Sequence, residues 1–362
     1  MSLPKVRTWP LLLPLAWLYG AGVGLRNWLF GRGWLRSVSF AGRVPVICVG
    51  NIAAGGTGKT PHVEYLVRLL QAHGIGPVAV LSRGYGRRSR GFVLAAEGID
   101  PARLGDEPYQ IHRKFPGLIV AVDADRVHGI RRLLALPEPP RAVILDDAMQ
   151  HRYVRAGLTV CLTAYSRILY KDLLLPAGRL REPARGIRRA DVVVVTKCPA
   201  GGLSQEDAVE VTGNLPTHLD QPIVVSAYRY GRLVSLSSLR PADVGCTTPV
   251  LLLTGIADPS AMEQYVGTQF RLTDKMAFGD HHRFTPKDLA AVRRRLEAIG
   301  PEAVVVTTEK DAARLERHDA LDEELKARIY VLPVEAFFPD PKQEQTFNQT
   351  VIRYVTENPA DR

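Results

Sequence analysis

The sequence predicts a two-domain α/β protein whose larger domain is a doubly wound, mostly parallel sheet. Short apolar runs alternate with amphipathic stretches along most of the chain, as they do when strands and covering helices alternate. A glycine-rich turn links the first of these runs to an expected helix. The 362 residues also exceed the usual size of one hydrophobic core, so a second, smaller α/β domain is expected.

The strands expected in the larger domain are runs rich in valine, isoleucine and leucine. They occupy residues 44–49, 78–82, 118–122, 142–146, 158–163, 191–196 and 223–227. Continuous apolar runs of this length are typical of parallel strands that are covered on both faces. The helices that would cover them are expected at residues 61–72, 106–115, 126–135 and 204–214.

A polar stretch that is poor in strand-forming residues follows at 228–248, and we interpret it as a linker. Further buried strands are expected beyond it at residues 250–254, 303–308 and 329–334, with helices at 259–268 and 285–299. The larger domain is therefore predicted at 41–227 and the smaller C-terminal α/β domain at 249–362.

The first 40 residues combine apolar, aromatic and basic side chains. The 18 residues between Arg7 and Arg26 are uncharged, which is a borderline length for a membrane span, and prolines and glycines interrupt them. Aromatic side chains favoured at the lipid–water boundary occur here as Trp9, Trp17, Tyr19 and Trp28. We predict a membrane-interfacial helical segment at 1–40. A helix buried against the protein's own core and a cleaved signal peptide are the alternatives.

The charge distribution indicates an anionic partner, and the cysteines indicate a protein without disulfides. The formal net charge is +10, and the basic residues that precede the first acidic residue, Glu64, are Lys5, Arg7, Arg26, Arg32, Arg36, Arg43 and Lys59. Such a basic end suits nucleic acid or an anionic lipid surface. The four cysteines are widely spaced with no CxxC pair, which indicates free thiols in a reducing compartment and not a disulfide framework or a zinc site.

The glycine-rich turn has the features of a phosphate-binding loop, or P-loop. It reads Gly55-Gly56-Thr57-Gly58-Lys59-Thr60 and lies between an apolar strand and a helix opened by Pro61. The backbone N–H groups of such a loop surround phosphate oxygens, Lys59 reaches the β- and γ-phosphates, and Thr60 binds Mg²⁺. The site for a nucleotide is therefore predicted to include Ala53, Ala54, Gly55, Gly56, Thr57, Gly58, Lys59 and Thr60.

Neighbouring residues favour ATP over other uses of this loop. Ala53 stands where the usual pattern has glycine, and a purely structural turn is the alternative to nucleotide binding. Partitioning and maturation ATPases have a lysine immediately before the paired glycines, whereas this chain has Ala54. GTPases read guanine with an Asn/Thr-Lys-x-Asp motif, but Thr196-Lys197-Cys198-Pro199 has no aspartate at the required place.

Carboxylates in the same sequence indicate metal and proton chemistry. Asp146 and Asp147 end an expected strand, at the sheet edge where ligands bind, so either can hold Mg²⁺; a helix cap or turn is the alternative. Asp106 begins an expected helix, and His281 lies in a later loop next to Asp280 and His282. Taken alone, Asp106 fits a helix cap. The residues Asp280-His281-His282 fit solvated loop side chains or part of a metal cluster.

Several further motifs follow the phosphate loop in order along the chain. They are Ser82-Arg83-Gly84-Tyr85-Gly86, Gly105-Asp106-Glu107-Pro108, Asp146-Asp147 with Gln150-His151, Leu175-Pro176-Ala177-Gly178 with Arg181-Glu182, and Thr308-Glu309-Lys310-Asp311. Together with the phosphate loop, this order resembles the tetraacyldisaccharide 4'-kinase family of lipid A biosynthesis, over nearly the whole chain. The family commonly has a glycine and an apolar residue after the paired acids, where this sequence has Ala148-Met149.

The resemblance implies a reaction and a site. The reaction is transfer of the ATP γ-phosphate, with Mg²⁺, to the 4'-hydroxyl of a tetraacylated glucosamine disaccharide 1-phosphate, at the cytoplasmic face of the bacterial inner membrane. The protein would be peripheral or anchored by its N-terminus. Asp106 matches the catalytic base and His281 its partner. The residues that match the lining of the cleft are Arg83, Tyr85, Glu107, Arg126, Gln150, His151, Arg181 and Glu182.

Two other classes remain as alternatives to the kinase. A P-loop ATPase or GTPase with a binding role would hydrolyse nucleotide without a lipid acceptor. A nucleic-acid-binding ATPase would show steeply salt-dependent binding. Few aromatic residues accompany the basic clusters Arg87-Arg88-Arg90 and Arg185-Arg188-Arg189, so we predict no nucleic-acid partner. The sequence also indicates no obligate protein partner.

Overall fold

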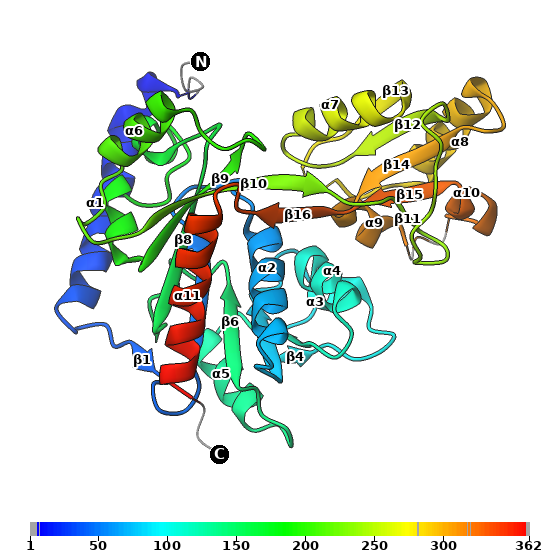
Figure 1. Ribbon diagram of the computed structural model, residues 1–362. Coiled ribbons are helices and arrows are strands. Elements are labelled where there is room, and N and C mark those ends of the chain that lie inside the picture. The colour runs from blue at the N-terminus through cyan, green and yellow to red at the C-terminus, as the bar shows by residue number, and fades with distance from the viewer. Residues whose placement is uncertain (1–5, 7, 281, 317, 319, 360–362) are drawn as a thin grey trace. The chain divides into compact units, whose positions relative to one another are not determined.

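The computed structural model describes residue 6 and residues 8–280, 282–316, 318 and 320–359. The chain forms two compact units, Met1–Arg229 with Ala336–Arg362 and Tyr230–Glu335. Figure 1 shows the elements of both units along the chain.

The first unit is built on a nine-stranded sheet in the described part of the chain. Its strands are parallel from β10 to β5, and β4 is antiparallel to β5. The order across the sheet is β16 (Val334–Phe337), β10 (Ile223–Tyr230), β9 (Val192–Cys198), β8 (Leu158–Ala164), β2 (Val46–Asn51), β6 (Ala142–Asp146), β3 (Val78–Ser82), β5 (Ile119–Val122) and β4 (Val93–Leu94). The predicted doubly wound α/β class is confirmed.

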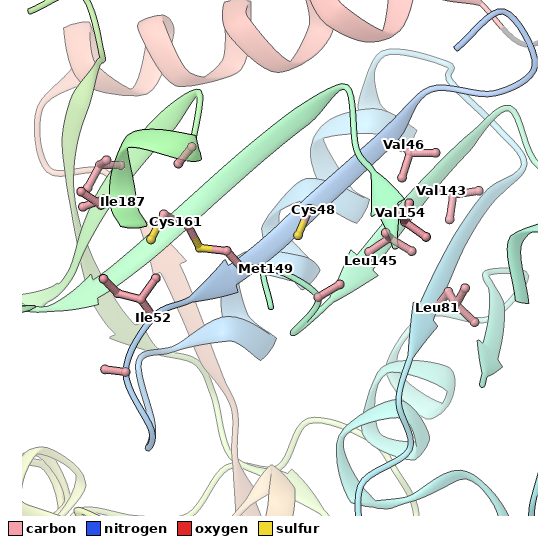
Figure 2. Close-up of a cluster of buried hydrophobic side chains, with 14 of the residues drawn as sticks. Val46, Cys48, Ile52, Leu81, Val143, Leu145, Met149, Val154, Cys161 and Ile187 are labelled. Carbon is pink, nitrogen blue, oxygen red and sulfur yellow. The ribbon is translucent and has the colours of Figure 1, made fainter. Parts of the chain in front are cut away.

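Alternate residues of the central strand β2 pack on opposite faces of this sheet. Ile47 and Val49 join a cluster with α2 (Lys59–Ala72), α4 (Asp106–Lys114) and α11 (Pro341–Glu357). Val46 and Cys48 join the cluster on the other face, which Figure 2 shows, with α5 (Arg126–Leu134) and α6 (Gln205–Asn214). The uninterrupted apolar character of the strands follows from this double burial.

Shorter elements complete the first unit. Helix α3 (Pro101–Leu104) precedes α4, and β1 (Val38–Ser39) pairs in parallel with β7 (Val154–Arg155). In the described residues of this unit, 3₁₀ helices lie at Pro10–Leu12, Leu169–Lys171 and Ala184–Arg189. The thiols of Cys48 and Cys161, which lie within apolar runs, are free and buried, and so is the thiol of Cys198, whereas the free thiol of Cys246 in the second unit is exposed.

The second unit contains a five-stranded sheet, again counted in the described residues. Its order is β11 (Val234–Ser235), β15 (Ile329–Leu332), β14 (Val304–Thr308), β12 (Pro249–Thr254) and β13 (Arg271–Ala277). Only the β11–β15 pair of this order is antiparallel. The helices are α7 (Ser260–Gln269), α8 (Pro286–Ile299), α9 (Glu309–Leu315) and α10 (Glu323–Ala327).

The units differ from the predicted boundaries at the C-terminal end. The sequence assigned residues 249–362 to the smaller domain, but Phe347, Val351 and Val355 of α11 pack with Val63 and Leu66 of α2 in the first unit. Three apolar residues at a spacing of four place one face of α11 on the sheet. The predicted linker at 228–248 also contains the end of β10 and the short strand β11.

Helix α1 (Leu13–Gly31) forms most of the described N-terminal segment. Only Ala16 and Phe30 of this helix are buried, while Trp17 and Leu18 are about 70% exposed (68% and 72%). Among the described residues we find no helix that is both long enough and apolar enough to cross a membrane.

Candidate active site

The phosphate loop lies where the sequence predicted it, between β2 and α2. Gly58 has φ 88° and Gly55 has φ 112°, in the left-handed region that favours glycine. A β-carbon on Gly58 would also lie 2.1 Å from the Tyr228 hydroxyl of β10. Residues 53–58 therefore form a turn that leads into the N-terminus of α2, where backbone N–H groups suit an anion.

Buried polar side chains of neighbouring elements stabilise this loop through hydrogen bonds. The Asn51 amide donates to Thr57 Oγ1 at 2.6 Å, and the Thr196 hydroxyl of β9 donates to the Thr57 carbonyl at 2.8 Å. His62 lies 2.7 Å from the Gly58 carbonyl through Nδ1 and 2.9 Å from the Ser226 hydroxyl through Nε2. Because a carbonyl can only accept, Nδ1 carries the proton and Nε2 accepts from Ser226.

The histidine in this network is neutral. Burial lowers the pKa of His62 from 6.5 to about 4, although its hydrogen bond to Gly58 raises the pKa slightly. The roles of His62, Thr196 and Ser226 as supports of the loop were not predicted from the sequence. His62 belongs to no recognised motif, because it lies inside the amphipathic helix after the phosphate loop. Ser226 is far from the phosphate loop in the sequence.

The paired acids lie at the end of β6, next to the loop. Lys59 Nζ is 3.7 Å from Asp147 Oδ2, and Arg181 Nη1 is 3.3 Å from the same oxygen. Asp147 has φ 48°. Met149 packs closely on β2, since a β-carbon added to Gly50 would lie 2.7 Å from the β-carbon of Met149. The turn with Ala148-Met149 therefore still brings the paired acids to the loop.

Asp146 is the more buried of the two acids. Its Oδ2 accepts a hydrogen bond from Ser82 at 3.1 Å. Burial raises the pKa of Asp146 to about 6, with a further increase from the charge of Asp147. Within the described residues, Asp146 Oδ1 is buried and has no hydrogen-bond partner. A buried carboxylate oxygen left in this state is a suitable ligand for a hard cation.

A strap formed by residues 172–182 crosses the start of the phosphate loop. Ala54 N donates to the Arg179 carbonyl at 2.7 Å, and Arg181 N donates to the Ile52 carbonyl at 2.7 Å. Gln150 Nε2 donates to the Asn51 carbonyl at 2.6 Å and to Glu182 at 3.1 Å. These bonds bring the predicted residues Gln150, Arg181 and Glu182 to the P-loop.

Helix α1 contacts both this strap and the neighbouring Gln150. The Tyr19 hydroxyl donates to the Arg181 carbonyl at 2.8 Å, and Arg26 donates to the Gln150 carbonyl at 2.7 Å. Asn27 Nδ2 lies 3.4 Å from Glu182. The N-terminal helix is therefore part of the wall that supports the site.

The two motifs that follow β3 lie close together. A β-carbon on Gly105 would lie 2.8 Å from the Tyr85 carbonyl, so the turn after β3 packs on the residue that precedes Asp106. Helix α4 is joined to α2 through the buried Glu64, which accepts from Gln110 at 3.0 Å. The charge of Glu107 also acts on Asp146 across the sheet edge and raises its pKa. These contacts place the first turn of α4 at the same edge as the P-loop.

Arg126 and His151 extend the polar site. Arg126 is 2% exposed and donates to the carbonyls of Asp123 and Ala124 at 3.1 and 3.2 Å. Burial lowers the pKa of His151, and the positive charges of Arg126 and Arg83 lower it further. Among described side chains, Arg126 Nε and His151 Nε2 are buried polar atoms that lack a hydrogen-bond partner. Such atoms fit a polar or phosphorylated ligand.

His281, the predicted partner of Asp106, lies outside the described residues. Its neighbours belong to the second unit, where Lys310 lies 3.3 Å from Asp280. His282 Nε2 lies 3.0 Å from Asp288 in the cap of α8, and its ring stacks on Phe278. His282 therefore has a structural role in this unit.

The phosphate loop, the paired acids and a converging set of arginines define a P-loop nucleotide-binding protein equipped for phosphoryl transfer. The chain matches the family model "Tetraacyldisaccharide-1-P 4'-kinase" over residues 8–353, and it belongs to this family. The resemblance predicted from its motifs is thereby confirmed.

Relatives and a solved structure agree with this assignment. A tetraacyldisaccharide 4'-kinase of Bacteroides fragilis is 48% identical, with 98% of this chain and 94% of the relative covered. The enzyme of the same name from Flavobacterium johnsoniae is 40% identical, with 96% and 97% covered. The crystal structure of "apo" form LpxK from Aquifex aeolicus in complex with ATP has a TM-score of 0.72 and 29% identity, covering 95% of this chain and 98% of that one.

Proposed function

We propose that this protein transfers the γ-phosphate of ATP to the 4'-hydroxyl of a tetraacylated glucosamine disaccharide 1-phosphate, which yields the 4'-phosphorylated lipid A precursor, lipid IVA. The observation that carries this proposal is the convergence of Lys59 and Arg181 on Asp147, beside the loop that begins α2. Phosphoryl transfer requires cations on the transferred phosphate and an acid that holds Mg²⁺, and this arrangement supplies both.

Asp106 is the proposed catalytic base, and Lys59 the cation on the transferred phosphate. Asp106 lies in the first turn of α4 and is partly exposed, so it is accessible to a sugar hydroxyl. It would accept the proton of the 4'-hydroxyl as that oxygen attacks the γ-phosphorus, and His281 would orient it. Alignment of the reactants and neutralisation of charge lower most of the barrier in such a reaction.

Mg²⁺ is the proposed metal, bound by Thr60 with Asp146 or Asp147. The buried Asp146 Oδ1, which has no hydrogen-bond partner among the described residues, fits a hard cation with oxygen ligands. Thr60 lies in the first turn of α2, and its hydroxyl is the type of ligand expected there. When bound, the ion would neutralise charge on the β- and γ-phosphates.

The acceptor would be bound by the remaining polar residues of the site. Arg126 Nε and His151 Nε2 are donors or acceptors that the described part of the protein leaves unused. We propose that they bind the sugar hydroxyls or the 1-phosphate, together with Arg83, Tyr85, Glu107, Gln150, Arg181 and Glu182. Arginine suits such a ligand because its guanidinium binds phosphate with two parallel hydrogen bonds.

The anionic surface of the inner membrane is the proposed location, with the protein at its cytoplasmic face. Trp17, Leu18 and Leu25 of α1 are exposed, and a helix with exposed apolar residues and basic neighbours binds at the lipid–water boundary. The Tyr19 hydroxyl of the same helix donates to the Arg181 carbonyl of the strap. A lipid acceptor would thus remain near the membrane while its sugar reaches the site.

A transfer assay tests the proposed function. The purified protein is incubated with γ-labelled ATP, Mg²⁺ and the detergent-solubilised disaccharide 1-phosphate lipid, and the lipid product is separated and counted. We expect label on the lipid, little ATP hydrolysis without the lipid, and no labelled lipid from a Lys59→Ala control. Rapid hydrolysis without acceptor, with no labelled lipid, would instead identify an ATPase.

A further inference from the structure

Two cations from outside the phosphate loop lie at its exposed tip. Arg179 Nη1 is 3.2 Å from the position that a β-carbon would take on Gly55. Lys197 Nζ is 3.7 Å from the corresponding position on Gly56. Both glycines are exposed, so a ligand bound to the loop would contact the same surface as these side chains.

Arg179 is held in this place by the strap. Its carbonyl accepts from Ala54 N at 2.7 Å, and its own N–H donates to Asp172 at 3.2 Å. The residues that follow continue the contact, since Arg181 N donates to the Ile52 carbonyl. The backbone of Arg179 is therefore hydrogen-bonded to the phosphate loop, which limits how far its guanidinium can move from Gly55.

Lys197 is held by a strained backbone at the end of β9. Its φ is 58°, a left-handed conformation that residues other than glycine and asparagine rarely adopt. The preceding residue, Thr196, donates its hydroxyl to the Thr57 carbonyl of the loop. An outlier of this kind at the edge of a ligand site indicates that the side chain's direction matters.

We propose that Arg179 and Lys197 bind the polyphosphate of the nucleotide from outside the loop. Lys59 and Arg181 both lie against Asp147, so part of their charge is balanced within the protein. Partitioning and maturation ATPases carry an additional lysine within the loop itself, at the position that Ala54 occupies here. In this chain the strap and β9 supply that additional charge, which would also neutralise charge that develops during transfer.

Calorimetric titration with AMP, ADP and ATP in Mg²⁺ tests this proposal. The variants are Arg179→Gln and Lys197→Asn, the latter because asparagine tolerates the left-handed backbone while the charge is lost. We expect each to weaken ATP binding about 10-fold, since a charge-assisted hydrogen bond contributes about that factor. The loss should diminish from ATP to ADP to AMP, and Lys197→Arg should retain most of the affinity.

The matched control is Arg141→Gln, which removes an exposed arginine at the opposite end of β6 and should leave all three affinities unchanged. ATP affinities within twofold of the wild type in both site variants would overturn the proposal. An equal loss for AMP and ATP would also overturn it, because that result indicates a structural effect on the loop.

The proposal rests on the proposed function only in requiring a nucleotide at the P-loop. Titration uses no lipid, so its outcome is separate from the transfer assay. Wild-type protein that binds ATP more tightly than AMP but phosphorylates no lipid would reject the kinase reaction alone. Wild-type protein that phosphorylates lipid while both variants keep its ATP affinity would reject only the role of Arg179 and Lys197.

Discussion

Asp106 is the residue on which the proposed chemistry depends most directly. It occupies the first turn of α4, next to the turn that carries Tyr85. We predict that Asp106→Ala lowers kcat roughly 10²–10⁴-fold, the usual cost of removing a general base, while the affinity for ATP stays near that of the wild type. Single-turnover transfer and ATP titration measure the two quantities. Turnover near the wild-type rate would reject Asp106 as the base.

His62 supports the phosphate loop through its hydrogen bond to the Gly58 carbonyl. We predict that His62→Ala raises KM for ATP about fivefold to 10-fold, because it removes one hydrogen bond to Gly58. His62→Asn should restore much of the affinity, since its amide can still donate to that carbonyl. Steady-state kinetics of both variants check this. Equal effects of alanine and asparagine would contradict the positional role.

The same histidine makes folding stability depend on pH. Its pKa is lowered by burial to about 4, so below pH 6.5 the unfolded chain binds the proton more readily and stability falls. Between pH 7 and pH 5 this single group should cost the metal-free protein about 2 kcal/mol of unfolding free energy. Urea unfolding at both pH values should show a smaller loss in His62→Asn than in the wild type.

At the scale of elements, the strands were the most predictable feature. The predicted ranges 78–82 and 142–146 coincide with β3 and β6, because strands buried on both faces have uninterrupted apolar sequences. Strand β13 was missed, since its side chains are mostly exposed and its sequence is largely polar. Helix α11 was not predicted, and its return to the first unit depends on contacts with α2 that lie far away in the sequence.

In the candidate site too, some residues could be predicted from the sequence and others depend on the fold. The P-loop, Asp146 and Asp147 could be found from the sequence because their chemistry requires fixed spacing after a strand. The supports of the loop could not, since Thr196 and Ser226 are single polar residues on strands that meet the loop only in the fold. Arg179 lies inside a recognised motif, but only its position over Gly55 distinguishes it from a solvated arginine.

One motif that identified the family has a structural role at the start of α9. Asp311 is fully buried and accepts from Gly255 N at 2.8 Å and from the Thr308 hydroxyl at 2.8 Å, and it pairs with Arg314 at 2.9 Å. We predict that Asp311→Ala lowers the unfolding free energy of the second unit by about 3 kcal/mol, because Arg314 loses its buried partner. Hydrogen exchange should show faster exchange in β12 and β14, while that of β2 and β6 stays unchanged.

At the scale of the whole molecule, charge and apolar surface are concentrated at the N-terminal end. The sequence places seven basic residues before its first acid, and α1 carries Trp17, Leu18, Leu25 and Trp28 in exposed positions. Neither property alone distinguishes a membrane surface from another anionic partner. Their combination at one end of the chain, with the apolar side chains on a helix that is bonded to the strap of the site, favours a membrane, because a lipid surface offers both apolar and anionic contacts.

Vesicle binding tests this interpretation of the N-terminal helix. We predict that the double variant Trp17→Ser, Leu18→Ser binds anionic vesicles at least about 30-fold more weakly, because the two side chains together should contribute about 2 kcal/mol or more when they are buried in lipid. Its melting temperature should match the wild type, since both side chains are already exposed. Leu94→Ser, which changes an exposed leucine on β4, is the matched control and should bind vesicles normally. Unaltered vesicle binding by the double variant would show that α1 does not dock on lipid.

If α1 holds the site at the membrane, this variant should also lose activity toward acceptor in vesicles while it retains activity toward detergent-solubilised acceptor, because only the first reaction requires the protein to reach a lipid surface.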